Sequence, residues 1–154
     1  MAVELLRPKG FGWIRLRRIE NDSDECVVPF VQTCIEPGAQ VRTGGSDAYR
    51  SLSGLGYVQQ RTVMLGSDVP AHVSMAGVHR VAALIKRWIP GTHHGSVQPA
   101  HLEAYLDEFV FRFNRCISGS RSMLVYPLLQ QVVVTEPVTY DKIVRPLPKQ
   151  AKQR

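Results

Sequence analysis

The sequence has little of what marks secreted, zinc-binding or membrane-spanning proteins. It contains three cysteines, Cys26, Cys34 and Cys116, and no Cys-x-x-Cys pair. This spacing argues against a disulfide framework and against a structural zinc site. No apolar run approaches the roughly 18 to 20 residues of a membrane span. The first residues also lack the basic-then-apolar order of a secretory signal. We therefore expect a cytoplasmic protein with reduced thiols and no membrane partner.

Positive charge, by contrast, is in excess. The 19 Lys and Arg residues outnumber the 13 Asp and Glu residues, which gives a formal net charge of +6. Such an excess indicates an anionic partner, most commonly a nucleic acid. The candidate DNA-binding cations lie in two predicted helices: Arg80, Lys86, Arg87, Arg112 and Arg115. Contact with DNA phosphates and ordinary surface charge are both compatible with these positions.

Hydrophobic periodicity and turn residues predict an α/β order of elements in one domain of residues 1–134. We expect strands at residues 2–7, 11–19, 39–43 and 57–65, helices at residues 21–35, 47–52, 75–89 and 99–117, and a loop at residues 66–74. Residues 122–134 should form a further helix, or a helix that runs into extended chain with a bend at Pro127. The first two strands should form a hairpin. Pro90 and Gly91 should end one helix, and Pro99 should occupy the first position of the next. The prolines and cations of residues 135–154 predict a disordered basic tail.

The segment from Val78 to Arg115 is the most informative part of the chain. His79 and Lys86 are seven residues apart, close to two helical turns, so both side chains project from one face. The segment resembles the C-terminal part of the catalytic domain of bacterial insertion-sequence transposases of the DDE class, in the ISXO-type subgroup whose third acidic position is His. The matching residues are His79, Lys86, Trp88, Gly91-Thr92-His93 and the run from Tyr105 to Arg115.

This resemblance implies an RNase-H-like fold, a mixed five-stranded sheet with flanking helices. In that fold the first strand lies at the centre of the sheet and carries the first catalytic Asp. Here no Asp-bearing apolar strand precedes Ala2, and the first Asp in the sequence is Asp22. We therefore expect a truncated domain that lacks the first central strand. The open sheet edges left by this absence would favour self-association, so a homo-oligomer is possible.

The resemblance also implies an active site of two Asp and one His that holds Mg²⁺ or Mn²⁺. In it, His79 is the metal ligand and Lys86 a catalytic residue beside the DNA. The second Asp stands in a Thr-Asp-Gly pattern followed by Tyr. Thr43, Gly45 and Tyr49 fall on that pattern, but Gly44 occupies the position of the carboxylate. One imidazole is a poor basis for a site of hard divalent cations, which favour carboxylate oxygens. The sequence thus predicts a catalytic domain that has lost productive metal binding.

Other polar residues have simpler interpretations. Asp47, three residues beyond Gly44, could replace the missing carboxylate only if the backbone followed a different path. Adjacent histidines such as His93 and His94 rarely converge on one metal ion, and we expect them in the loop between two helices. Glu103 and Asp107 share a helix face and could form an acid–base pair. Their position beside the apolar stripe favours a solvated face instead.

Three hypotheses for the function follow. The chain is a transposase-derived protein of DNA transposition, here catalytically inactive; a non-catalytic nucleic-acid-binding protein that reuses the scaffold; or the product of a truncated reading frame without a function of its own.

Overall fold

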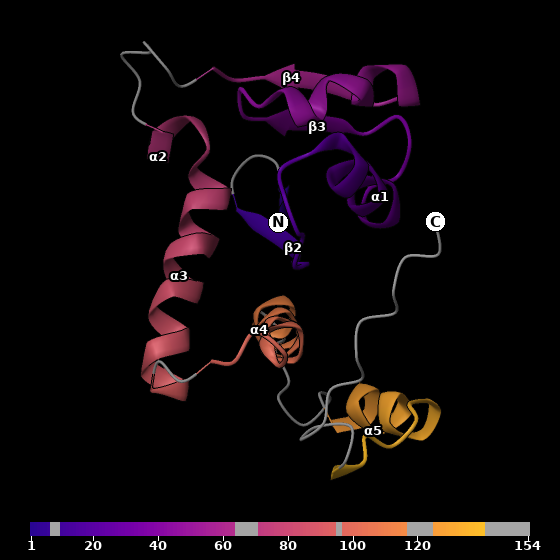
Figure 1. Ribbon diagram of the computed structural model, residues 1–154, viewed down its shortest axis with the longest axis vertical. Helices are drawn as coiled ribbons and strands as arrows, with labels where there is room; N and C mark the ends of the chain where they lie inside the picture. The colour runs from indigo at the N-terminus through magenta and orange to yellow at the C-terminus, as the bar shows by residue number, and fades with distance from the viewer. Residues whose placement is uncertain (7–9, 64–70, 95–96, 117–124, 141–154) are drawn as a thin grey trace.

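The structure is a computed structural model that describes residues 1–6, 10–63, 71–94, 97–116 and 125–140. The four described strands lie in the N-terminal part of the chain together with α1 and η1, and helices α2 to α5 follow (Figure 1). The elements are β1 (Ala2–Leu5), β2 (Phe11–Arg15), α1 (Asp24–Cys34), β3 (Gln40–Thr43), the 3₁₀-helix η1 (Asp47–Leu55), β4 (Val58–Arg61), α2 (Ala71–Ser74), α3 (Ala76–His93), α4 (Leu102–Arg115) and α5 (Val125–Val134). The predicted mixed α/β class is confirmed.

The described strands form two separate two-stranded sheets. In the first, β1 and β2 pair antiparallel with Val3 opposite Ile14, which confirms the predicted hairpin. In the second, β3 and β4 pair parallel with Gln40 opposite Val58. Parallel strands need a crossover connection, and here η1 supplies it. Hydrogen bonds from Val58 N–H to Ala39 O and from Thr62 N–H to Thr43 O extend this pairing at both ends.

One hydrophobic core joins α1 to η1 and to the parallel sheet. Its buried residues, which we call the α1 core, are Val27, Phe30, Val31, Ala48, Leu52 and Tyr57. The Tyr57 hydroxyl donates a hydrogen bond to Ile35 O at 3.0 Å, so the polar end of this buried ring has a partner. Ala2 of β1 and Val41 of β3 both pack against this core. The hairpin and the parallel sheet therefore both contact the same helical cluster.

A second core holds α3 and α4 against the hairpin. Ile14, Val81 and Phe109 are its buried residues, and we call it the α3–α4 core. Trp88 and Phe113 pack around it. Helix α3 approaches the hairpin closely at Gly77, where a Cβ would lie 3.1 Å from the Phe11 ring and 3.2 Å from Leu5 Cδ2. The absence of a side chain at this position thus sets the contact distance between α3 and the hairpin.

Two hydrogen bonds of the Asn114 side chain hold α4 against the outer edge of β2. Its Oδ1 accepts a hydrogen bond from Ile14 N–H at 2.7 Å, and its Nδ2 donates one to Ile14 O at 3.1 Å. One amide group thus satisfies both backbone groups of a residue that an edge strand would otherwise leave unpaired. Because these groups point toward α4, the open edge of the hairpin is the outer edge of β1.

Several predicted boundaries were wrong. Helix α3 continues through Pro90 to His93 instead of ending before Pro90. Pro90 lies in the last turn, where its missing N–H removes one hydrogen bond, and ring contacts of His93 hold that turn. Pro99 does not open the next helix, because it lies in a turn closed by the His101 N–H to Gln98 O bond, and α4 begins at Leu102. Helix α2 also occupies part of the predicted loop.

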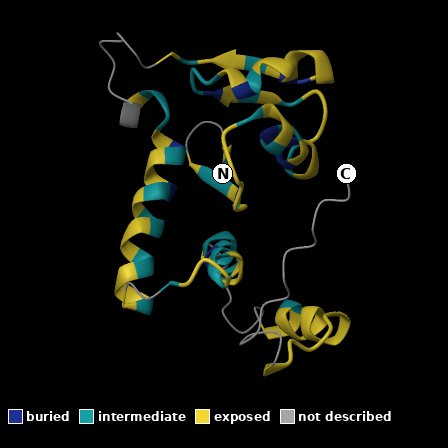
Figure 2. Cartoon of the chain, in the orientation of Figure 1, coloured by how far each residue is buried: buried dark blue, intermediate teal, exposed yellow. Residues whose placement is uncertain are grey.

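The burial pattern separates the two cores from an exposed C-terminal part (Figure 2). All three cysteines are free thiols. Burial raises the pKa of the Cys34 thiol, so this group stays protonated at neutral pH. Within the described residues, no helix is both long enough and apolar enough to cross a membrane. Most of the predicted basic tail, residues 141–154, lies outside the described residues.

We expect Asn114→Ala to destabilise the fold by about 1 to 3 kcal/mol, because it leaves a backbone N–H and C=O at Ile14 without partners. Asn114→Asp should also destabilise, since it keeps an acceptor for the N–H but sets a carboxylate against the Ile14 carbonyl. The measurement is urea unfolding followed by circular dichroism, with Asp107→Ala on the exposed face of α4 as the control. A decrease in stability no greater than that of the control would show that this pair of hydrogen bonds does not hold α4 to β2.

Candidate functional site

Helix α3 carries the two residues expected to act in catalysis. His79 and Lys86 are both exposed on this helix, whereas Val81 between them is fully buried in the α3–α4 core. The His79 N–H donates to Met75 O at 3.1 Å in the first turn. The burial of Val81 fixes the rotation of the helix about its axis. The structure therefore places both predicted residues in a helix and in contact with solvent, while their roles stay predictions.

The turn after β3 holds the position of the expected second carboxylate. Thr43, the last residue of β3, is buried, and its Oγ1 accepts a hydrogen bond from Gln59 Nε2 at 3.0 Å. Gly44 follows directly, and a Cβ built there would meet nothing within 4 Å. The position thus has room for a carboxylate side chain but supplies no ligand atom.

The parallel sheet and helix α3 meet near this turn. The Arg42 guanidinium lies 3.5 Å from the Ser74 carbonyl oxygen, which links β3 to the last residue of α2. Figure 1 shows α2 and the start of α3 beside the ends of β3 and β4. The fold therefore brings the element that precedes Gly44 close to the segment that precedes His79.

Asp47, the alternative carboxylate, forms ion pairs with two arginines. It opens η1, as the sequence predicted, and its Oδ1 lies 2.8 Å from Arg50 and 3.3 Å from Arg61. Ser46 caps the same helix by accepting a hydrogen bond from Ala48 N–H, and its hydroxyl donates to Asp22 at 2.8 Å. These contacts direct Asp47 toward neighbouring arginines.

Tyr49, which falls on the family pattern, stays a neutral phenol. Burial first, and then the Asp22 carboxylate, raise the pKa of its hydroxyl. Tyr49 also packs against the α1 core. Its contacts are therefore those of a packing residue.

The side chains of the described residues do not fit a site for Mg²⁺ or Mn²⁺. Among them, no group of three or more His, Cys, Asp or Glu residues is arranged to hold a metal ion. These cations favour several carboxylate oxygens, and here Gly44 provides none and Asp47 is paired with arginines. His79 alone would offer a single neutral nitrogen.

The cations predicted to bind DNA differ in their surroundings. Arg80 and Arg87, seven residues apart on α3, line a groove together with Arg112 of α4. Arg112 is also held by Glu108, with its guanidinium 2.8 Å from the carboxylate. Arg115 stacks over the Phe111 ring at 3.9 Å. Lys86 is exposed beside Arg87. Three of the five cations thus share one groove.

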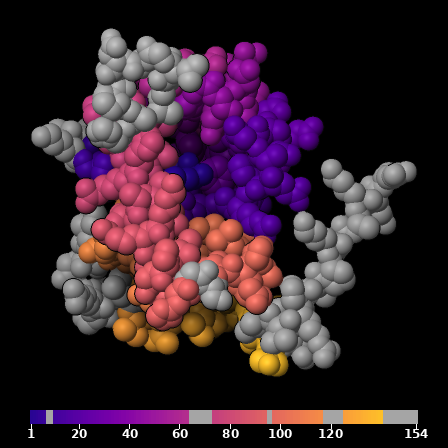
Figure 3. Space-filling view, turned by 60° about the vertical axis from the view of Figure 1, so that its left-hand side comes forward, coloured from indigo at the N-terminus to yellow at the C-terminus, as the bar shows by residue number. Residues whose placement is uncertain are grey.

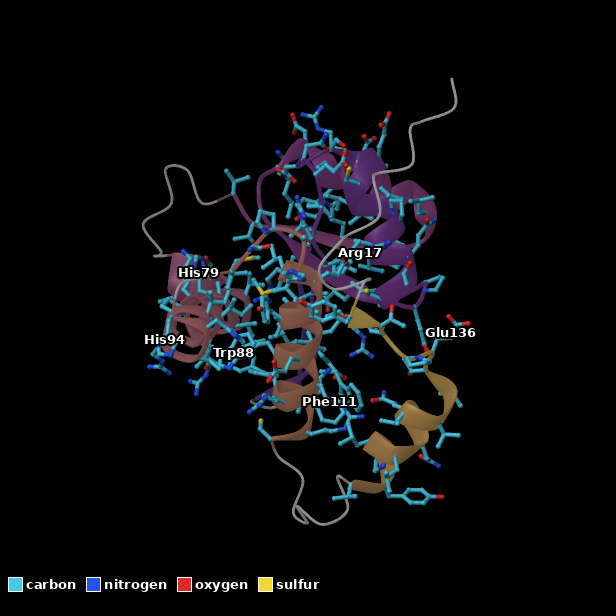
Figure 4. The ribbon with its side chains drawn as sticks, turned by 60° about the horizontal axis from the view of Figure 1, so that its bottom comes forward. Arg17, His79, Trp88, His94, Phe111 and Glu136 are labelled. Carbon is cyan, nitrogen blue, oxygen red and sulfur yellow. The ribbon has the colours of Figure 1, made fainter. Side chains whose placement is uncertain are left out.

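Aromatic residues of the family motif form a ladder between α3 and α4. The Trp88 ring lies edge-on to His93 at 4.8 Å and tilted against Phe109 at 5.5 Å. His93 also contacts the Tyr105 ring at 4.2 Å, and its buried Nε2 has no hydrogen-bond partner among the described residues. Figure 4 shows Trp88 between the two helices. The expectation that both histidines lie in a loop was therefore wrong for His93, since only His94 follows the helix, at a left-handed φ of 50°.

Sequence reasoning missed two features of this region. The first is Asn114, whose partner Ile14 is 100 residues away in the sequence. The second is the groove that the three arginines share, which depends on how α3 and α4 pack. The spacing of hydrophobic residues predicts which face of a single helix is apolar. It does not predict which distant residues come into contact, so neither feature could be found from the sequence.

These features define a mixed α/β domain in which a helix bearing His and Lys packs on a hairpin. The family model for the ISXO2-like transposase domain matches residues 1–114, and the chain belongs to this family. The resemblance to insertion-sequence transposases of the DDE class is thereby confirmed. Comparison with curated proteins and comparison with solved structures each gave no match.

Proposed function

We propose that this protein is a transposase-derived DNA-binding protein that neither cuts nor joins DNA. The proposal rests on a difference between helix α3 and the turn after β3. Helix α3 presents exposed cations at Arg80, Lys86 and Arg87, whereas the turn at Gly44 has no carboxylate. The described residues thus offer cations for contact with DNA phosphates, and the turn at Gly44 offers no carboxylate for a metal ion.

The chemistry of transposition explains why this contrast matters. Strand cleavage and transfer proceed by in-line attack on a phosphodiester, with two divalent cations that activate the attacking oxygen and stabilise the leaving one. DNA binding, by contrast, does not require bound divalent cations. Cations at its phosphates release counterions, which drives association without any sequence information. The family, the net charge of +6 and the exposed cations of α3 all support such binding.

The RNase-H-like fold belongs to the same proposal. In that arrangement β1–β2 and β3–β4 are two parts of one sheet, and a strand between β1 and β3 carries the first catalytic Asp. Two observations support it. Asn114 covers the far edge of β2, which leaves the β1 edge open, and Ala2 and Val41 pack on the same α1 core. No described strand pairs with the open edge of β1 or of β3.

We expect weak binding to duplex DNA without sequence preference and with a steep dependence on salt. Replacing Arg80, Lys86 and Arg87 by Ala should lower the log–log salt slope by about 0.9 for each phosphate that the variant no longer neutralises. The control is the Arg42, Arg50 and Arg61 triple-Ala variant, which removes the same charge from cations bonded to Gln60 and Asp47. Fluorescence-anisotropy titrations at several salt concentrations measure both slopes.

The same titrations compare a duplex that carries a terminal inverted repeat of an insertion element of this family with a scrambled duplex. Deleting residues 142–154 should reduce the slope further and leave sequence discrimination at nil. Equal slopes for the two triple variants would reject α3 as the DNA-binding surface. A preference for the repeat duplex at physiological salt would show that this chain itself reads sequence.

We also expect no DNA cleavage or strand joining with Mg²⁺ or Mn²⁺, because the described donors do not fit a two-metal site. The assay follows nicking of a supercoiled plasmid that carries the same terminal inverted repeat. Metal-dependent nicking that disappears in His79→Ala and persists in His101→Ala would overturn this conclusion, since the second variant removes a histidine outside the predicted site.

A further inference from the structure

Helix α5 is an apolar helix that the described part of the chain leaves uncovered. Its sequence, VYPLLQQVVV, contains no charged residue, and none of its residues is buried. Tyr126, Leu129 and Val133 are 67%, 55% and 83% exposed. At spacings of three and four residues these side chains share one face. A ten-residue helix gains most of its stability from tertiary packing, so an uncovered apolar helix requires a partner surface.

The groove between α3 and α4 is an uncovered apolar surface on the same chain. Its volume is about 760 Å³, and Leu84, Trp88, Phe109 and Phe113 line it. Phe11 lies at its hairpin side, and no α5 residue lines it. Figure 3 shows α5 beyond α4, at the lower edge of the molecule. Within the described residues, one chain thus carries an exposed apolar helix and an open apolar groove of the kind that accepts such helices.

The charges around the two surfaces are complementary. Arg80, Arg87 and Arg112 line the groove. The last turn of α5 has no basic residue, so the partial negative charge at its C-terminus has no cationic side chain on that helix to offset it. Glu136 follows just beyond α5, and Figure 4 shows it on the outer side of the molecule. An α5 helix in the groove would bring both negative groups toward the arginines.

We propose that α5 of one copy docks in the α3–α4 groove of a second copy, so that two chains exchange α5 helices. The exchange is reciprocal, which allows a closed two-fold dimer in which both apolar surfaces are buried. The proposal concerns assembly and holds whether or not the protein binds DNA.

The first test measures the mass of the full-length protein without DNA by light scattering coupled to gel filtration. We expect a dimer for the wild type and a monomer for the Leu129→Asp, Val133→Asp double variant. The control is Leu55→Asp, Val63→Asp, which places the same charges on other exposed apolar residues and should stay dimeric. A wild-type monomer at every concentration tested, or an α5 variant that stays dimeric, would overturn the proposal. The second outcome would instead indicate association through open sheet edges.

The second test uses the exposed thiol of Cys116, which lines the groove. Gln130→Cys is introduced in a Cys26→Ser, Cys34→Ser background, and the protein is oxidised. We expect a disulfide-linked dimer on a non-reducing gel, and we expect it to disappear when Cys116→Ser is added. An intramolecular disulfide, seen as a monomer without free thiols, would show that α5 docks in the groove of its own chain and would overturn the exchange.

Discussion

The packing of α3 and α4 on β2 is the constraint on which the rest of the described structure depends. Ile14 contributes its side chain to the α3–α4 core and both of its backbone groups to Asn114. Val81, packed in the same core, fixes the rotation of α3 about its axis. That rotation decides which residues of α3 face solvent. The exposure of His79, Lys86 and the neighbouring arginines is therefore a consequence of apolar packing on the opposite face of the helix.

Most of the side chains that match the family motif pack between helices α3 and α4. Trp88, His93, Tyr105, Phe109 and Phe113 form the ladder of rings between α3 and α4. His79 and Lys86 are the matched residues that the resemblance places in catalysis, and both are exposed on α3. The ring contacts of this ladder lie on α3 and α4 and do not involve Gly44, where a Cβ would meet nothing within 4 Å.

The sequence predicted local structure well and contacts between distant residues poorly. The β1–β2 hairpin, β3 and the apolar faces of α3 and α4 follow from alternation, helical spacing and turn residues. The end of α3 does not, because ring contacts of His93 with Trp88 and Tyr105 outweigh the local effect of Pro90. The start of α4 was also misplaced, because Pro99 lies in a turn. For the candidate site, the sequence placed His79 and Lys86 on one helix and marked Gly44. The groove and the Asn114 hydrogen bonds depend on tertiary packing, which periodicity does not encode.

The central claim is that the motif residues divide into a packing set and a solvent-facing set. Single alanine variants compared by urea unfolding test it most directly. Trp88→Ala and Phe109→Ala should each lower the free energy of unfolding by about 3 kcal/mol, the usual cost of removing a large aromatic side chain from a core. His79→Ala and Lys86→Ala should each change it by less than about 0.5 kcal/mol, as exposed residues do. A decrease for His79→Ala as large as that for Trp88→Ala would contradict the account.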